Sequence, residues 1–442
     1  MEKIKPRIFS GTRDFLPEEM LQREEIVDKI KGAFRRYGFL PVETPAIEYL
    51  DILLGKYGDE GDRMIYRLAY EEGNTLALRY DLTVPMSRLV AMYHGQLQYP
   101  FKRYQIQPVW RSDRPQIRQG RFREFYQCDA DIVGSEAMLA DAEIVALTNE
   151  ILSALGFEEF VIRINHRKIL RAITLHSGLR LEDEPVVCRC IDKLDKIGLD
   201  GVRKEMLDSG FGDKVADSIF DVLALEGGHE ELLNRLLSLL GTAEGAEEGI
   251  GETQELLQDV GRLGVPADNF RLDLYLARGL DYYTGPIYES VLPAHPHIGS
   301  LTGGGRYDEL IGLYSGIDVP ATGTTIGLDR MFAAMGQLGM LSERRTTTRV
   351  LVINFGGEEL AGALAFTGSL REAGIAAEVY YEAARLKKQL SYADRKGIPY
   401  VAIIGEKEAK SGRVSIKKLA SGEQETLPLA EALNMLRDKE AE

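Results

Sequence analysis

Long apolar runs and cysteines are both scarce in this sequence of 442 residues. It contains no uninterrupted run of roughly 18 apolar residues, the length that a helix needs to cross a bilayer, and its first residues lack the apolar stretch of a signal peptide. The cysteines, Cys128, Cys188 and Cys190, have neither the even number of a disulfide framework nor the spacing of a zinc site. We therefore expect no membrane span and a reducing, cytoplasmic location.

Positive charge is also in short supply, since the formal net charge is −15 at pH 7. This balance argues against general binding of nucleic acid but is compatible with one local basic patch. Residues 383–418 hold ten basic against three acidic side chains, a local charge of +7. The contrast favours a partner with a phosphate backbone, and solvated surface lysines are the alternative.

The fingerprints of the phosphate loop and of dinucleotide binding are absent as well, which excludes two common kinds of nucleotide site. The composition, 44% hydrophobic and 28% charged, is typical of a globular protein. At this length a chain usually forms more than one hydrophobic core, so we expect two to four domains.

What the sequence does contain begins with an amphipathic helix. Pro17 suits the first helical position, apolar residues recur with helical spacing as far as Tyr37, and Gly38 ends the pattern. The extended stretch Phe39–Glu48 follows, and its prolines suit a sheet edge or an interface. Helix and strand together predict either ordinary core packing or a dimer seam, and the pattern does not choose between them.

The most informative stretch is 276–291. The preceding residues, 271–276, alternate apolar and polar side chains, which predicts a half-buried strand with Arg278 on its apolar face. A guanidinium on such a face is costly unless an anion meets it. Together, Arg278, Asp281, Tyr282 and Tyr283 could recognise a small zwitterion. An internal Arg278–Asp281 ion pair beside two core tyrosines is the alternative.

Residues 101–134 predict a hairpin, with the strands Phe101–Arg111 and Arg121–Val133 on either side of a polar loop. On the returning strand, a period of two separates an apolar face from a polar face. The polar face carries arginines near the loop and amide and carboxylate groups farther in: Arg121, Arg123, Gln127, Asp129 and Asp131. A solvated outer face is one interpretation. The other is a site for a ligand with a polyanionic end and a donor-bearing end.

Three further sites have two interpretations each. Asp81 follows a predicted strand, where it could accept from an ammonium or cap the helix after Pro85, and Thr83 could add a hydroxyl. Residues 303–308 form a glycine-rich turn that permits the close approach of a ligand. Arg330 lies in the first turn of a predicted helix, where the helix dipole disfavours a cation. We expect an anionic partner for Arg330, with capping or a salt bridge to Asp329 as the alternative.

Two regions differ in character from the rest of the chain. Residues 166–258 show helical spacing of leucines, which predicts a helical insertion. Its histidines, His166, His176 and His229, lack ligand spacing and are expected to be structural or exposed. Beyond a polar linker, alternating β and α patterns from Val350 onward predict a separate α/β domain with a parallel or mixed sheet.

In combination these motifs resemble the histidyl-tRNA synthetases over essentially the whole length. Phe34–Glu48 resembles the first signature of class II aminoacyl-tRNA synthetases, the hairpin around Arg111 and Asp113 the second, and Gly327–Arg330 the third. The stretch 276–284 followed by 303–308 is similar to the two motifs that set the histidine-specific family apart.

The resemblance implies an α+β fold with three parts. These are a class II catalytic domain with an antiparallel sheet of the six-stranded type (residues 1–165 and 259–338), the helical insertion domain (166–258) and a C-terminal α/β anticodon-binding domain (347–442). It implies a histidine–tRNA ligase that makes histidyl-adenylate and pyrophosphate from L-histidine and ATP, with Mg²⁺ on the phosphates. Transfer of histidine to the 3′ end of tRNA(His) follows. An obligate homodimer is also implied.

By position, the resemblance implies a histidine pocket made of the following residues: Asp81, Leu82 and Thr83 at the ammonium, Gln127 at the amino-acid backbone, Asp131 at an imidazole N–H, and Tyr282, Tyr283 and Tyr307 around the ring. It implies an ATP site with Arg111 at the α-phosphate and the histidine carboxylate, Arg278 opposite, Asp113 at the adenine, and Arg121 and Arg330 at the outer phosphates. Arg111 and Arg278 would be the catalytic pair, and no residue is expected to ligate a metal. Because a hydrogen-bonding pocket rejects isosteres of histidine, we expect no editing site.

A non-catalytic paralogue is the competing interpretation, either the regulatory subunit of ATP phosphoribosyltransferase or a histidine or tRNA sensor. Such regulatory subunits usually lack the anticodon domain and have degraded histidine motifs, whereas Arg278 and residues 347–442 are both present here. A sensor would keep the motif arginines but fail to make adenylate.

Overall fold

The computed structural model describes residues 4–55, 64–69, 75–117, 120–278 and 282–438. It divides into two compact units. The first contains Ile26–Met340 with the residues up to Arg13, and the second contains Asp14–Glu25 with the residues from Leu341 onward. Helix α1 (Pro17–Arg36) contributes to both. Among the described residues, no helix combines the length and the apolar character that a membrane span requires.

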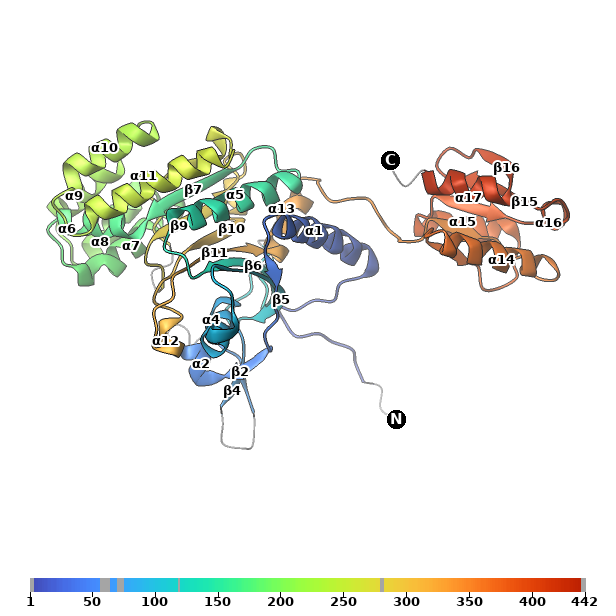
Figure 1. Cartoon of the computed structure of the whole chain (residues 1–442), viewed down its shortest axis with the longest axis horizontal. Helices are drawn as coiled ribbons and strands as arrows, with labels where there is room; N and C mark the ends of the chain where they lie inside the picture. Colours follow the sequence, from blue (N-terminus) through green and yellow to red (C-terminus); the bar gives the residue numbers. More distant parts are fainter. Residues whose placement is uncertain (1–3, 56–63, 70–74, 118–119, 279–281, 439–442) are drawn as a thin grey trace. The chain divides into compact units, whose positions relative to one another are not determined.

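An eight-stranded sheet forms the centre of the first unit (Figure 1). Six of its strands are antiparallel to their neighbours, and a short parallel strand extends each edge. In spatial order the strands are β1 (Leu40–Pro41), β5 (Phe101–Trp110), β6 (Glu124–Val133), β11 (Ala321–Gly327), β10 (Thr302–Arg306), β9 (Pro286–Val291), β7 (Val161–His166) and β8 (Phe270–Leu272). The predicted antiparallel sheet is therefore present, with two edge strands in addition.

The predicted hairpin is formed by β5 and β6. Their register places three polar pairs on one face of the sheet: Arg103 opposite Asp131, Gln105 opposite Asp129, and Gln107 opposite Gln127. Strand β6 begins at Glu124 instead of Arg121, because the amide of Arg123 donates to the carbonyl of Gly11, 2.8 Å away, outside the sheet. Gln127, Asp129 and Asp131 on this face are buried, so the interpretation as a solvated outer face is wrong for them, whereas Arg121, before the strand, is exposed.

The opposite face of the sheet is apolar under helices α5 (Met138–Ala154) and α13 (Leu328–Gln337), where Cys128, Ala130 and Ile132 are buried.

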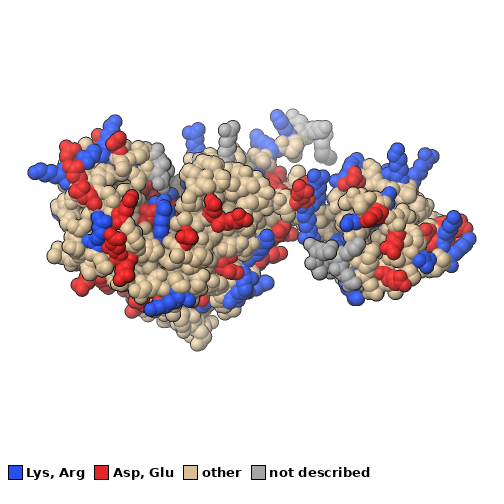
Figure 2. Space-filling model, turned by 90° about the horizontal axis from the view of Figure 1, so that it is seen from above, with Lys and Arg blue, Asp and Glu red and all other residues tan. Residues whose placement is uncertain are grey.

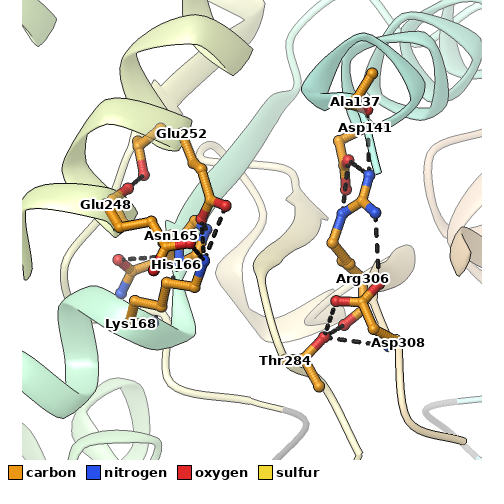
Figure 3. A network of polar contacts seen from close by, with 12 residues as sticks. Ala137, Asp141, Asn165, His166, Lys168, Glu248, Glu252, Thr284, Arg306 and Asp308 are labelled. Carbon is orange, nitrogen blue, oxygen red and sulfur yellow. Dashed lines mark hydrogen bonds and ion pairs between the residues drawn. The ribbon is translucent and has the colours of Figure 1, made fainter. Parts of the chain in front are cut away.

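One buried carboxylate, that of Asp141, links α5 to this face. Asp141 accepts from Arg306 Nε at 3.0 Å and from the hydroxyl of Thr322 at 2.8 Å, and Arg306 also donates to the carbonyl of Ala137 (Figure 3). Arg306, inside the glycine-rich motif, is thus a structural residue. Removing one partner of such a buried pair costs about 3–5 kcal/mol.

The insertion lies between β7 and β8 and consists of helices: α6 (Arg167–His176), α7 (Glu184–Ile191), α8 (Leu194–Asp208), α9 (Asp213–Leu223), α10 (His229–Leu240) and α11 (Ala246–Arg262). Its helical character was predicted correctly. His166 is buried, its Nδ1 accepts from the amide of Lys168 at 3.1 Å, and its Nε2 lies 2.9 Å from Glu252 on α11 (Figure 3). His166 therefore links β7 to the insertion, as expected of a structural histidine.

The first unit also contains a small three-stranded sheet made of β2 (Ile47–Tyr49), β3 (Arg67–Leu68) and β4 (Leu76–Leu78). In this sheet β4 lies between β2 and β3. Helix α2 (Leu50–Leu54) follows β2, and α4 (Thr83–Tyr93) packs with α12 (Gly312–Ser315). The start of α4 at Thr83 places Pro85 in its first turn, where a missing N–H costs nothing.

The second unit holds a five-stranded mixed sheet, as predicted. In spatial order its strands are β13 (Ala377–Val379), β12 (Val350–Val352), β14 (Tyr400–Ile403), β15 (Arg413–Lys418) and β16 (Gln424–Pro428), the first three parallel. Its helices are α14 (Glu359–Glu372), α15 (Leu386–Lys396), α16 (Glu406–Ser411) and α17 (Leu429–Asp438). Val350 and Leu351 alternate between two separate apolar clusters, so both faces of this sheet are covered.

Candidate active site

A cavity of about 540 Å³ opens on the polar face of the eight-stranded sheet. Residues from β6, β9, β10, β11, the hairpin loop and the segment before β9 line it. Eight of the predicted site residues are among them: Arg111, Asp113, Arg121, Gln127, Arg278, Tyr282, Tyr283 and Arg330. The structure therefore brings together residues that are more than 200 positions apart in the chain.

Four arginines face this cavity. Burial and then the charges of Arg121, Arg278 and Arg111 lower the pKa of Arg330 to about 10. The Arg330 Nη1 donates to the carbonyl of Ser300 at 2.5 Å. So many like charges around one enclosed space are unfavourable until an anion enters, which indicates a polyanion site.

Local backbone geometry places the hairpin loop against the start of α13. Gly120 has a φ of +67°, and a Cβ there would lie 2.9 Å from the Cα of Arg330. Only glycine therefore permits this approach, which brings Arg121 beside Arg330. Asp329 accepts from Arg13 and, at 2.8 Å, from the amide of Tyr126, so it ties α13 to the N-terminal segment and to β6.

Arg111, which with Arg278 forms the predicted catalytic pair, is held in place by neighbouring residues. Its Nε donates to the carbonyl of Tyr80 at 2.9 Å, and its guanidinium lies 5.1 Å from the ring centre of Phe125. Asp113 is exposed at the rim of the cavity. Two contacts thus hold Arg111 at the cavity wall before any substrate binds.

Two further predicted site residues, Asp131 and Tyr307, are buried in the sheet and lie outside the cavity lining. The hydroxyl of Tyr307 donates to Asp131, and Arg103 lies 2.6 Å from the second oxygen of Asp131. A Cβ on Gly323 would be 2.0 Å from this carboxylate, and a Cβ on Gly305 would be 2.8 Å from the ring of Tyr283. The glycines of β10 and β11 therefore make room for the carboxylate and the phenol, in addition to any close approach of a ligand.

Asp81, Leu82 and Thr83 lie outside the cavity lining. Asp81 is buried and its Oδ1 accepts from the amide of Val84 in the first turn of α4, at 3.1 Å, although the N-cap position itself is Leu82. Burial raises the pKa of Asp81 to about 6, against the lowering effect of that amide and of Arg111 and Arg103. Leu82 is fully buried, and Thr83 begins α4. A contact of these residues with an ammonium stays a prediction.

Tyr282 and Tyr283 lie against each other with ring centres 4.3 Å apart, and the Tyr282 hydroxyl donates to that of Tyr283 at 3.0 Å.

Arg278 is paired with Asp192 and Glu289. The proposed partner Asp281 lies outside the described residues. The strand before Arg278 also ends at Leu272 instead of continuing, because Asp273 accepts from the amide of Tyr275 and pairs with Arg163.

The sequence patterns identified Asp129 only as part of the polar face, and they missed two other buried charged residues of this face, Arg103 and Glu289. Burial raises the pKa of Asp129 to about 8, although Arg103 and a hydrogen bond from Thr325 lower it. The alternation of Arg103, Gln105 and Gln107 along β5 was the signal that could have extended the polar face to this strand.

Comparison with known proteins agrees with this geometry. Residues 11–331 match the model of the histidyl-tRNA synthetase family, and residues 349–439 match an anticodon binding domain. The chain is 45% identical to the histidine–tRNA ligase of Gloeobacter violaceus, covering 96% of each chain, and 42% identical to that of Cytophaga hutchinsonii, covering 98% and 99%. The chain belongs to the histidyl-tRNA synthetase family.

A solved structure supports the assignment at the level of the fold. The histidyl-tRNA synthetase of Nostoc sp. PCC 7120 superimposes with a TM-score of 0.90 at 34% identity, covering 99% of this chain and 100% of that one. The predictions of the family, of the α+β fold and of a histidine-specific aminoacyl-tRNA synthetase are thus confirmed. These matches favour the synthetase over the non-catalytic paralogue.

Proposed function

We propose that this chain activates L-histidine with ATP, releasing pyrophosphate, and then transfers histidine to the 3′ end of tRNA(His). The observation that carries the proposal is a cavity lined by four arginines and by Gln127, Tyr282 and Tyr283. The buried Asp131–Tyr307 pair lies behind these tyrosines, with the ring of Tyr307 6.0 Å from that of Tyr282. Such a cavity fits a reaction between a triphosphate and an amino acid whose side chain donates hydrogen bonds.

The arginines explain the first step. Two anions must meet, because the histidine carboxylate attacks the α-phosphate of ATP. Arg111 and Arg278 at the reacting centre would offset this repulsion, and Arg121 and Arg330 would hold the outer phosphates while pyrophosphate leaves. Positioning and electrostatic stabilisation carry such a step, with no side-chain nucleophile.

Recognition of histidine is assigned to the other residues of the site. Asp131 would accept an imidazole N–H, and Tyr307 keeps this carboxylate in place by donating to it. Tyr282 and Tyr283 would flank the ring, Gln127 would contact the amino-acid backbone, and Asp81 with Leu82 and Thr83 would hold the ammonium. The Gln127 Oε1 is buried without a hydrogen-bond partner, as expected of a group that a substrate satisfies.

Mg²⁺ would enter this site bound to the phosphates of the nucleotide, with few ligands from the protein. Of the carboxylates that line the cavity, Glu289 is paired with Arg278 and Asp329 with Arg13, and Asp113 is exposed. Within the described ranges, no group of three metal-ligating side chains is assembled. Bound to the phosphates, Mg²⁺ would neutralise part of their charge, as it usually does with few protein ligands.

The second unit is assigned to the anticodon. The basic residues of 383–418 are mainly exposed, among them Arg385, Lys387, Arg395 and Lys407. Figure 2 shows lysine and arginine side chains at the surface of both units. We assign residues 1–165 and 259–338 to catalysis, 166–258 to the insertion and 347–442 to anticodon binding.

We also propose a cytoplasmic homodimer, for which the exposed apolar side chains of Leu40, Ile47 and Tyr49 after α1 offer a surface.

Pyrophosphate–ATP exchange with each of the twenty amino acids in turn tests the proposal. We expect exchange with histidine alone, because only histidine presents an imidazole N–H to Asp131. Absence of exchange in a protein that still binds histidine would assign the chain to a regulatory or sensing role instead.

A further inference from the structure

Arg278 is held by two carboxylates that come from different parts of the first unit. Its Nε lies 3.1 Å from the Oδ1 of Asp192, and its Nη1 pairs with Glu289. Glu289 belongs to β9, in the middle of the sheet, whereas Asp192 follows directly after α7 in the insertion. The guanidinium thus has one anchor in the catalytic sheet and one in the inserted helices.

The anchor in the sheet is rigid. Glu289 is 2% exposed, and its other oxygen lies 3.7 Å from Arg163, which is in turn paired with Asp273 at 2.7 Å. Burial raises the pKa of Glu289, while Arg278 and Arg163 lower it. A carboxylate surrounded in this way has little freedom to move.

The anchor in the insertion is also tied to the sheet. The amide of Arg167, at the start of α6, donates to the carbonyl of Gly285 at 3.0 Å, just before β9. The Arg167 side chain pairs with Glu184 in the first turn of α7, and both are buried. Asp192 caps the other end of α7 through its backbone N–H, which donates to Cys188 at 2.9 Å. The position of Asp192 is therefore determined by the positions of α6 and α7.

Arg278 needs these anchors because its neighbours repel it. Arg121 and Arg111 line the same cavity, and the charge of Arg278 acts on Arg330. Its side chain is 45% exposed and so could turn outward into solvent. Two carboxylates, on Nε and Nη1, oppose this turn and keep Arg278 at the wall of the cavity that it lines.

We propose that Asp192 is a positioning residue for Arg278, so that the helical insertion takes part in the activation of the amino acid. This proposal rests on the proposed function. Loss of the Asp192 charge leaves Arg278 with Glu289 alone, and the guanidinium turns about that single contact. Because the transition state depends on the placement of this cation, the effect falls on the chemical step and spares the binding of substrates.

Histidine-dependent pyrophosphate–ATP exchange of the full chain tests the proposal with the variants Asp192→Asn and Asp192→Glu. Asparagine keeps the size and the backbone cap. We expect Asp192→Asn to lower kcat about tenfold, with KM for histidine and ATP nearly unchanged, and Asp192→Glu to recover most of the loss. The matched control is Asp217→Asn, which removes an aspartate–arginine pair with Arg203 elsewhere in the insertion.

The outcomes separate the two proposals. A wild-type chain without histidine-dependent exchange overturns both. An active wild type in which Asp192→Asn behaves like Asp217→Asn overturns the positioning role and leaves the proposed function standing. A fall in kcat that Asp192→Glu does not recover, accompanied by a lower melting temperature, also overturns it, because the role would then be structural.

Discussion

The five-stranded sheet of the second unit buries apolar side chains on both faces, whereas the eight-stranded sheet of the first buries charged side chains on one face. In the first case Val350 and Leu351 alternate between two apolar clusters. In the second, Arg103, Asp129 and Asp131 share a buried surface. Burying charges gains little stability even when they are paired. Stability therefore does not account for the charged face, which is consistent with its proposed role in binding and chemistry, whereas the apolar faces of the five-stranded sheet are ordinary cores.

The largest effect that would sharpen this contrast is expected from Arg278→Ala. Loss of this cation at the reacting centre should lower the rate of adenylate formation about 10³-fold, with the fold and assembly unchanged. Single-turnover formation of histidyl-adenylate measures it. Arg271→Ala is the control, because Arg271 is also an arginine paired with an aspartate near β8 but is exposed outside the cavity. Near-normal activation by Arg278→Ala would remove Arg278 from the mechanism.

A smaller loss is expected from Tyr307→Phe, which leaves Asp131 without the hydroxyl that fixes it. An unsatisfied buried acceptor costs about 1–3 kcal/mol, so kcat/KM for histidine should fall about 10–100-fold, mainly through KM. Tyr314→Phe serves as control, since its hydroxyl donates to the carbonyl of Ile52 instead. Equal histidine KM values in the two variants would show that Asp131 is not in the histidine pocket.

Asp129→Asn is expected to stabilise the first unit. The pKa of Asp129 is near 3.9 when unfolded and about 8 when folded. Below pH 4 both states are protonated, and between these values only the unfolded state is ionised, so the wild type loses stability as the pH rises. The asparagine variant escapes this loss, with a gain on the order of 2 kcal/mol at pH 8 and none at pH 4.

Urea unfolding followed by the fluorescence of Trp110, the only tryptophan in the chain, measures this gain. Trp110 ends β5 and so reports on the sheet that carries Asp129. A gain that is the same at pH 4 and pH 8 would contradict the assigned titration.

The smallest effect is expected from the second unit. The double substitution Lys387→Glu and Arg395→Glu reverses two exposed charges on α15. It should weaken aminoacylation of tRNA about tenfold at low salt, while histidine-dependent exchange is unchanged. Arg437→Glu, on α17, reverses a charge outside the basic stretch and provides the comparison. Equal losses from both would mean that the basic stretch has no special role.

Sequence patterns predicted the hairpin, the insertion and the mixed sheet of the second unit because each is a local, periodic signal. The polar face of β6 was also identified, but whether it is solvated or buried depends on β11 and β10, which lie almost 200 residues downstream. The partners of Arg278 were not predictable for the same reason. Asp192 lies 86 positions away, directly after α7, and no period in either segment relates the two.

The central claim, that the charged face of the large sheet is the site of histidine activation, is tested most directly by a crystal structure with a non-hydrolysable histidyl-adenylate analogue. The account predicts an imidazole N–H on Asp131 beside Tyr307, with the phosphate between Arg111 and Arg278. An analogue bound with its imidazole away from Asp131, or with its phosphate remote from both arginines, would contradict it.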